Sequence, residues 1–295
     1  MKLFEFRETY GKSETIVSEL RTAGLLIPTM HCESCGDLMS EKRINKGDGV
    51  MFFCFKRTCR KGKSIRVKSF FEKSKLSLCD IMLFIHLWAK GYSEKLILDD
   101  FSFSNKTVVD WARYCRDLCV YHFENDDHVI GGEGTTVEID ETLAVKRKYN
   151  RGRMVRDGWL FGGIERRYDG EFRCFMRLVF DRSAPHLCHL IRQHVAPGTH
   201  IISDGWSAYR DLSTMGYRHS VVIHQENFVS PDNNYVHTQQ IESTWSSLKR
   251  FIRSRGGYKG PHYLEYIYEY LLRRKHKDIF AELLQVIRTE YPFNN

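Results

Sequence analysis

The order of predicted elements after residue 134 constrains the fold of this 295-residue chain more than any other feature. Three apolar runs rich in β-branched and aromatic residues come first, which is the composition of strands. An amphipathic helix, a short apolar strand, a second helical segment, a further strand, a polar loop and a long helix follow. In this order the segments are TTVEIDETLA (135–144), GWLFGGIER (158–166), EFRCFMRLVF (171–180), APHLCHLIRQHV (184–195), THIISD (199–204), WSAYRDLST (206–214), HSVVIH (219–224) and the helix that starts near Ile241.

This order is that of a ribonuclease-H-like sheet, in which three antiparallel strands are extended by two parallel ones. The continuous apolar character of the last two strands fits parallel strands, because these are covered on both faces. Two more predicted helices, 260–277 and 278–291, end the sequence. We therefore predict an α+β, multidomain chain in which residues 131–295 form a ribonuclease-H-like domain with a mixed five-stranded sheet and C-terminal helices.

Three acidic residues fall on elements that are neighbours in this fold. Asp140 lies on the first strand, Asp204 ends the fourth strand, and Glu242 lies in the first turn of the last helix of the domain. Their carboxylates can therefore converge on a pair of cations, as two-metal phosphoryl transfer requires. Each also has an ordinary explanation. Asp140 can be a polar strand end, with Glu138 or Glu141 in its role, because periodicity does not choose among them. Asp204 with Gly205 can be a strand-to-helix turn, and Glu242 favours the positive end of a helix dipole without any metal.

Four of the nine cysteines have the spacing of metal ligands. The first two form a C-x-x-C pair and the last two a looser C-x4-C pair, separated by eighteen residues. Two thiolate pairs on neighbouring turns predict one structural zinc ion in a zinc ribbon within residues 1–70, and four reduced thiols are the alternative. The four residues are Cys32, Cys35, Cys54 and Cys59.

The segment 76–123 has helical periodicity interrupted by two turns, which predicts three helices. The short polar turn before the third helix suggests a helix-turn-helix-like DNA-binding domain over residues 71–130, although a generic helical bundle has the same pattern. Lys106 and Arg113 on the third helix are candidate DNA contacts.

The net charge of +8 is concentrated in three segments. Residues 42–75 hold twelve Lys and Arg against two acids, residues 146–156 hold six against none, and residues 241–277 hold nine against three. Clustered positive charge indicates a polyphosphate partner. The candidate phosphate contacts are Lys146, Arg147, Lys148, Arg151, Arg153, Lys249, Arg250 and Arg253.

Several motifs in order resemble one family. VEIDET, KRKYNRGR, GWLFGGIER, ISDGWSAY and NFVSPDNNYVHTQQIESTWSSLKR are similar to the Merlin superfamily of DDE transposases and to its bacterial insertion-sequence relatives. The resemblance covers about residues 135–275. It implies that Asp140, Asp204 and Glu242 bind metal, that Lys249 accompanies them, and that His237 either contacts DNA, braces the metal site or is a structural loop residue.

The resemblance implies a transposase that binds terminal inverted repeats, cuts, and joins the freed ends to target DNA. Two Mg²⁺ (or Mn²⁺) ions per active site are expected in addition to one Zn²⁺, with double-stranded DNA as partner and a homodimer or higher oligomer on DNA. The alternatives are a domesticated DNA-binding regulator without transposition activity and a plain nuclease. No apolar run spans a bilayer and no signal peptide is apparent, so we expect a chain that is not secreted and works in the nucleus of a eukaryote or on the nucleoid in a bacterial cytoplasm.

Overall fold

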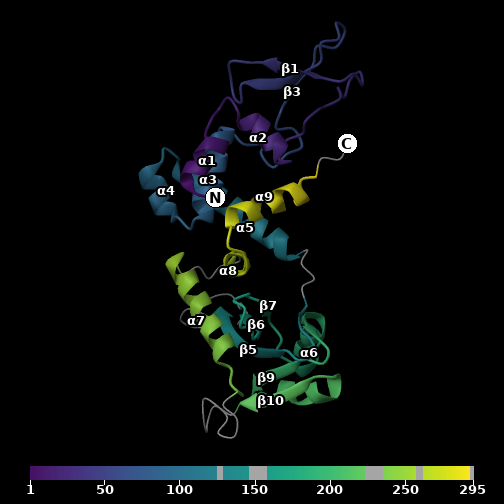
Figure 1. Cartoon of the computed structure of the whole chain (residues 1–295), viewed down its shortest axis with the longest axis vertical. Helices are drawn as coiled ribbons and strands as arrows, with labels where there is room; N and C mark the ends of the chain where they lie inside the picture. The colour runs from purple at the N-terminus through teal and green to yellow at the C-terminus, as the bar shows by residue number, and fades with distance from the viewer. Residues whose placement is uncertain (125–128, 146–157, 223–234, 257–261, 293–295) are drawn as a thin grey trace, which may run out of the picture. The chain divides into compact units, whose positions relative to one another are not determined.

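The computed structural model describes residues 1–124, 129–145, 158–222, 235–256 and 262–292. The packing divides the chain into two compact units, and most of their elements are labelled in Figure 1. Unit 1 combines residues 1–122 with residues 276–295, and unit 2 consists of residues 123–275.

Unit 2 is built on a five-stranded mixed sheet with the strand order β10-β9-β5-β6-β7. The central pair β5–β6 and the pair β6–β7 are antiparallel, whereas β9 runs parallel to both β5 and β10. The predicted combination of three antiparallel strands with two parallel ones is therefore confirmed. The bounds of the strands are β5 Thr136–Val145, β6 Gly158–Glu165, β7 Cys174–Val179, β9 His200–Asp204 and β10 Arg218–Val222. A small parallel pair, β4 (Ile130–Gly131) with β8 (Val195–Ala196), was not predicted.

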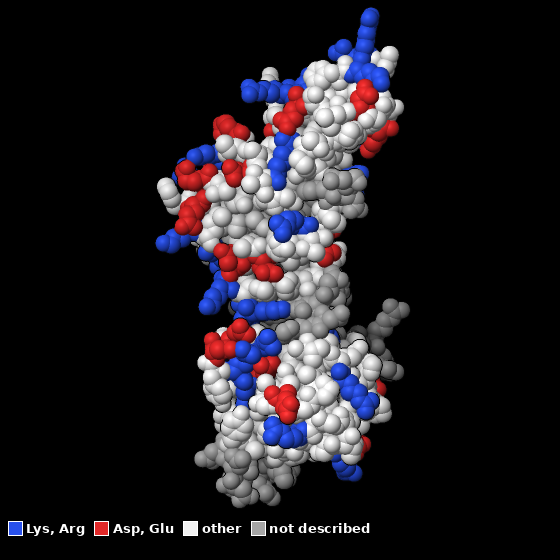
Figure 2. Space-filling view, turned by 45° about the vertical axis from the view of Figure 1, so that its right-hand side comes forward, with Lys and Arg blue, Asp and Glu red and all other residues white. Residues whose placement is uncertain are grey.

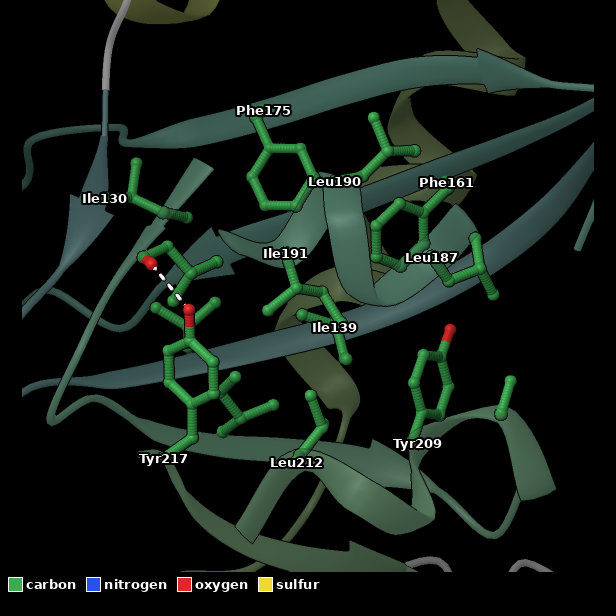
Figure 3. Close-up of a cluster of buried hydrophobic side chains, with 14 of the residues drawn as sticks. Ile130, Ile139, Phe161, Phe175, Leu187, Leu190, Ile191, Tyr209, Leu212 and Tyr217 are labelled. Atoms are coloured by element: carbon green, nitrogen blue, oxygen red, sulfur yellow. Dashed lines mark hydrogen bonds between the residues drawn. The ribbon is translucent and has the colours of Figure 1, made fainter. Parts of the chain in front are cut away.

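Helices cover both faces of this sheet. On one face, α6 (Ala184–His194) and the 3-10 helix η1 (Ser207–Met215) pack on the sheet through buried side chains such as Leu187, Leu212 and Tyr209 (Figure 3). On the other face, α7 (Gln239–Ser254) and α8 (Tyr263–Lys275) form a second apolar cluster with the sheet. Each large apolar side chain that becomes fully buried contributes about 1.5–3 kcal/mol. The two layers therefore hold the sheet rigidly between them.

Unit 1 begins with two short helices that the sequence did not predict, α1 (Leu3–Tyr10) and α2 (Ile16–Thr22). A three-stranded antiparallel sheet follows, made of β1 (Ser40–Arg43), β2 (Val50–Phe53) and β3 (Gly62–Ser64). The three predicted helices are present as α3 (Leu78–Ala89), α4 (Glu94–Asp100) and α5 (Asn105–Glu124). The hydroxyls of Ser77, Ser93 and Ser104 accept hydrogen bonds from the first turns of these helices, which explains where each begins.

The last helix, α9 (Ile279–Glu290), belongs to unit 1, although the sequence assigned it to the ribonuclease-H-like domain. Its Phe280 packs against Phe6 of α1 and against His86 of α3. This contact spans almost the whole sequence and has no local signal. Among the described residues, no helix is both long and apolar enough to cross a membrane.

Candidate active site and metal centre

The acids of β5 point to opposite faces of the sheet. Val137 and Ile139 belong to the cluster under α6 and η1, and side chains alternate along a strand. Glu138 and Asp140 therefore face α7, whereas Glu141 faces η1. This alternation separates Glu141 from the other two acids, and Glu138 and Asp140 are then distinguished by the residues of α7 that each contacts.

Glu138 is fully buried and serves the packing of α7 on the sheet. Its Oε2 accepts hydrogen bonds from the backbone amides of Gln240 and Ile241 at 2.8 and 3.0 Å, at the N-terminus of α7. Its Oε1 accepts from Nε of Arg166 at 2.6 Å. A carboxylate at this position satisfies amides that lack partners within the helix and complements the helix dipole.

Asp140 contacts α7 one turn farther along that helix. Its Oδ2 accepts a hydrogen bond from Nε1 of Trp245 at 3.0 Å. Burial raises the pKa of Asp140 to about 7, and the negative charges of Glu141 and Asp204 add to the rise. A carboxylate that is hard to ionise without compensating positive charge is a natural ligand for a cation.

Gly162 on β6 makes room for this contact. It pairs with Asp140, and a Cβ at Gly162 would lie 2.7 Å from the Trp245 ring and 2.7 Å from the carbonyl oxygen of Phe175. Any other residue here would displace the indole or the neighbouring strand. Gly162 and the hydrogen-bonding role of Trp245 are features that the sequence did not predict.

Asp204 lies beside Asp140 on the neighbouring strand. The parallel register pairs Glu138 with Ile202, and both aspartates are two residues beyond this pair. Ile202 packs with Val222 and outside the α6–η1 cluster, so Asp204 shares the face of Asp140. Asp204 Oδ1 accepts from the backbone amide of Trp206 at 3.0 Å, which shapes the turn after β9.

Glu242 lies in the first turn of α7, and its Oε1 accepts a hydrogen bond from the hydroxyl of Thr238 at 2.7 Å. Lys249 follows seven residues later, about two turns along the same side of the helix. Lys249, Arg250 and Arg253 are all exposed, and among the described residues none of them forms an ion pair. This end of the sheet thus has acids at the N-terminal part of α7 and cationic side chains along the outer surface of that helix.

The oxygens of Asp140, Asp204 and Glu242 are not among the groups of described metal-ligating atoms that lie within 4.8 Å of one another. A pair of cations spaced about 3.5–4 Å apart does not require that all ligand oxygens be so close. The donor set fits hard divalent cations such as Mg²⁺ or Mn²⁺, because all three side chains offer carboxylate oxygens.

Glu141 lies in different surroundings, on the η1 side. Burial raises the pKa of Glu141, while Tyr209 and the positive charge of Arg182 oppose the rise. The Arg182 Nε is 3.8 Å from Glu141 Oε1, and its guanidinium stacks on the rings of Trp159 and Trp206 at 3.8 and 4.4 Å. Glu141 is therefore paired with a cation on the side of the sheet away from Glu242.

His237 packs against the buried ion pair beneath α7. Its Nδ1 lies 3.0 Å from Nη2 of Arg166, and burial together with this guanidinium lowers the pKa of His237. Arg166 also donates to the carbonyl oxygens of Tyr235 and His237, both at 2.6 Å. Arg166 thereby holds the segment before α7 against the sheet by hydrogen bonds. The sequence did not predict this role.

The four cysteines Cys32, Cys35, Cys54 and Cys59 meet in unit 1 with all sulfur atoms within 4.8 Å of one another. Cys32 Sγ lies 3.4 Å from Cys59 Sγ, and Cys35 Sγ lies 3.5 Å from Cys54 Sγ. Four thiolates at the Zn–S distance of a tetrahedral site are about 3.8 Å apart, so the cluster fits zinc closely. All four cysteines are free rather than disulfide-bonded.

Two turns present these thiols. In the first, the amide of Gly36 donates to the carbonyl of Cys32 at 2.8 Å, and Gly36 has a positive φ of 76°. In the second, the amides of Cys59 and Arg60 both donate to the carbonyl of Lys56, and Arg60 has a φ of 50°. The longer C-x4-C spacing thus uses a left-handed arginine where the first turn uses glycine. The His31 side chain faces the carbonyl of Gly36 and is not part of the cluster.

The structure describes some of the predicted DNA contacts but not others. Lys106 and Arg113 are exposed on α5. Residues 30–64, which contain the four cysteines, are called the cysteine segment. On the face drawn in Figure 2, Lys and Arg side chains protrude at the top of the view, where this segment lies, with acidic side chains beside them. Five residues of the basic segment between β5 and β6 lie outside the described residues: Lys146, Arg147, Lys148, Arg151 and Arg153.

Comparison with known proteins identifies a family for unit 2. A sequence model of the ISXO2-like transposase domain matches residues 122–275, which is more than half of the chain and includes all of unit 2. No curated protein matches the chain.

Proposed function

We propose that this chain, which belongs to the family of ISXO2-like transposase domains, cuts DNA at the ends of a mobile element and joins the freed ends to target DNA. Within that family we assign it to the relatives of the Merlin superfamily. The proposal rests above all on one observation: Asp140 and Asp204 lie side by side on the face of the sheet that α7 covers. Glu242 enters α7 at the same face.

Asp140, Asp204 and Glu242 would hold two divalent cations, Mg²⁺ or Mn²⁺, which when bound activate the attacking hydroxyl and stabilise charge on the attacking and leaving oxygens. The protein itself contributes the positions of the three carboxylates. The rigid sheet fixes the two aspartates, and the Glu138–Arg166 pair fixes the N-terminus of α7 and with it Glu242. Both nucleophiles, water and a DNA 3′-hydroxyl, come from outside the protein, so no serine or tyrosine nucleophile is required.

DNA binding is assigned to the cationic surfaces. Lys249, Arg250 and Arg253 on α7, together with the segment 146–156, would contact phosphates next to the acids. We assign recognition of the terminal repeats to the cysteine segment with its zinc ion and to helices α3–α5, with Lys106 and Arg113 on α5. Because two ends are joined in one reaction, the active species on DNA would be at least a dimer.

The decisive experiment measures Mg²⁺-dependent cleavage of a duplex that carries the element's terminal repeat. Asp140→Ala, Asp204→Ala and Glu242→Ala should each abolish cleavage while a gel shift shows repeat binding nearly intact, since affinity comes mainly from phosphate contacts. Each single variant should be about as inactive as the triple variant, because residues that act as a unit are not additive.

Glu141→Ala is the matched control, because Glu141 is adjacent to Asp140 but faces η1. Cleavage by Glu242→Ala at a near wild-type rate, with loss of cleavage in Glu141→Ala, would show that the site is assigned to the wrong side of the sheet. Wild-type protein that binds the repeat but never cuts it would instead be a DNA-binding regulator.

A further inference from the structure

A second cluster of metal-ligating side chains lies in unit 1, away from the cysteines. His122, His276 and Glu282 offer ligand atoms that all lie within 4.8 Å of one another. His122 is near the end of α5, His276 lies between α8 and α9, and Glu282 is in the first turn of α9. Three separate elements thus direct their side chains to one point.

The distances within this cluster suit shared coordination. His122 Nδ1 lies 3.3 Å from Glu282 Oε1, and His276 Nδ1 lies 3.1 Å from Glu282 Oε2. Ligands at the Zn–N and Zn–O distances of a tetrahedral site are about 3.3 Å apart, so these separations fit a shared ion as well as they fit N–H···O hydrogen bonds. The two imidazole rings are 5.2 Å apart and nearly perpendicular, so their Nδ1 atoms approach the carboxylate from different directions.

The surroundings also suit a bound ion. The three side chains are between 16% and 24% exposed, so the cluster is largely shielded from bulk water. Two imidazoles and one carboxylate are the donor set of zinc sites that keep an open position. We propose that His122, His276 and Glu282 bind a second Zn²⁺ ion, completed by water.

The position of this site suggests its use. His122 is the last residue of unit 1 before the chain enters unit 2, and His276 is the first residue after the chain returns. A metal ion bound by these two residues would link the segment that leaves unit 1 to the segment that re-enters it. Glu282 would connect both segments to α9. The bound ion would therefore link these two segments of unit 1, and the site is separate from the proposed catalytic carboxylates.

The test is to compare the metal content of full-length wild type with that of Glu282→Gln after equilibration with Zn²⁺ and removal of the excess. A glutamine retains the size and hydrogen-bonding capacity of the side chain but is a poor zinc ligand. We expect Glu282→Gln and His276→Ala each to hold one zinc ion fewer per chain than wild type. His189→Ala, which removes an exposed imidazole of α6, is the matched control and should hold the wild-type amount.

Substitution by Co²⁺ identifies which site is lost. Thiolate ligands give intense sulfur-to-cobalt charge-transfer bands that imidazole and carboxylate ligands do not give. These bands should be unchanged in Glu282→Gln, while the total cobalt falls by one per chain. Equal metal content in wild type and Glu282→Gln would overturn the proposal and leave the cluster as a hydrogen-bonded His–Glu–His group. A loss confined to the thiolate bands would overturn it as well.

Discussion

Trp245 on α7 donates its indole hydrogen to Asp140 on β5 across 3.0 Å, and this bond joins the helix that carries Glu242 to the strand that carries the first aspartate. The indole is 4% exposed and lies in the apolar cluster under α7, so its orientation is fixed by packing. The hydrogen bond to Oδ2 fixes the orientation of the Asp140 carboxylate. Trp245 is thus a buried core residue whose indole orients the Asp140 carboxylate.

Trp245→Phe should keep the core packed but remove the donor. Loss of a partner that orients a metal ligand typically lowers metal affinity or activity 10–100-fold. We expect cleavage to fall by about that factor, with the Mg²⁺ concentration for half-maximal rate raised and part of the loss recovered at high Mn²⁺. Trp159→Phe, which changes a tryptophan on the η1 side, should leave the metal dependence unchanged. An unaltered metal dependence in Trp245→Phe would mean that the indole serves packing alone.

Substitutions of the two acids of β5 that face α7 should have different effects, because Glu138 supports the stability of the fold and Asp140 supports the proposed activity. In Glu138→Ala the buried guanidinium of Arg166 loses its counter-ion and two α7 amides lose their acceptor. Breaking a buried pair in this way costs about 3–5 kcal/mol, so chemical denaturation should show a strong loss of stability.

Asp140→Asn should abolish cleavage without lowering the stability of the protein. Because the folded-state pKa of Asp140 is raised to about 7 from 3.8, its contribution to stability is full below pH 3.8 and is lost as the pH rises through 7. Asparagine does not ionise, so the metal-free variant should be at least as stable as wild type at pH 8 and yet fail to cut. A variant less stable than wild type at that pH would contradict the unfavourable burial of this carboxylate.

How far the sequence predicts this site depends on the range of the interactions. The strands and their order follow from local patterns, and the mixed sheet confirms them. The choice among Glu138, Asp140 and Glu141 does not follow, because it depends on which face α7 covers and on which part of α7 each acid of that face contacts. That face is set by contacts with Gln240 and Trp245, about a hundred residues away in the sequence.

The same limit explains the placement of α9. Its apolar stripe predicts a helix but does not name the surface that it covers, and the surface is formed by α1 and α3 at the other end of the sequence. The cysteine cluster, by contrast, was predictable because it depends on residues that are close in the sequence. The spacing of the thiols already restricts where they can meet, and only the left-handed Arg60 in the second turn was unexpected.

Unit 1 should lose stability in mild acid through His86. This side chain is 1% exposed and stacks on Phe6 at 4.5 Å, with Phe280 at its edge. Burial lowers the pKa of His86 to about 4 from 6.5, and the positive charges of Lys90 and the N-terminus add to the effect while Asp278 opposes it. Neutral His86 therefore contributes fully to the stability of unit 1 above pH 6.5, and this contribution is lost as the pH falls towards 4.

His86→Phe should remove this contribution, because a phenyl ring can stack on Phe6 without taking up a proton. We expect the difference in thermal midpoint between pH 7 and pH 4.5 to be smaller in His86→Phe than in wild type, measured on full-length protein. His189→Phe, at an exposed site on α6, should retain the wild-type difference. An equal acid response in wild type and His86→Phe would show that other groups govern it.

The thiolate cluster should be essential to the cysteine segment. β1, β2 and β3 have only four, four and three residues, too few to be stable without support. Structural zinc in small domains contributes about 10–16 kcal/mol at pH 7, so removing it should unfold this segment. We expect strong chelators, or Cys59→Ser, to make residues 30–64 sensitive to limited proteolysis and to weaken repeat binding, while unit 2 stays protease-resistant. Cys188→Ser, which alters a half-buried thiol of α6, should do neither. Purified protein with well under one thiolate-bound metal ion per chain, yet a protease-resistant cysteine segment, would show that the four thiols act without zinc.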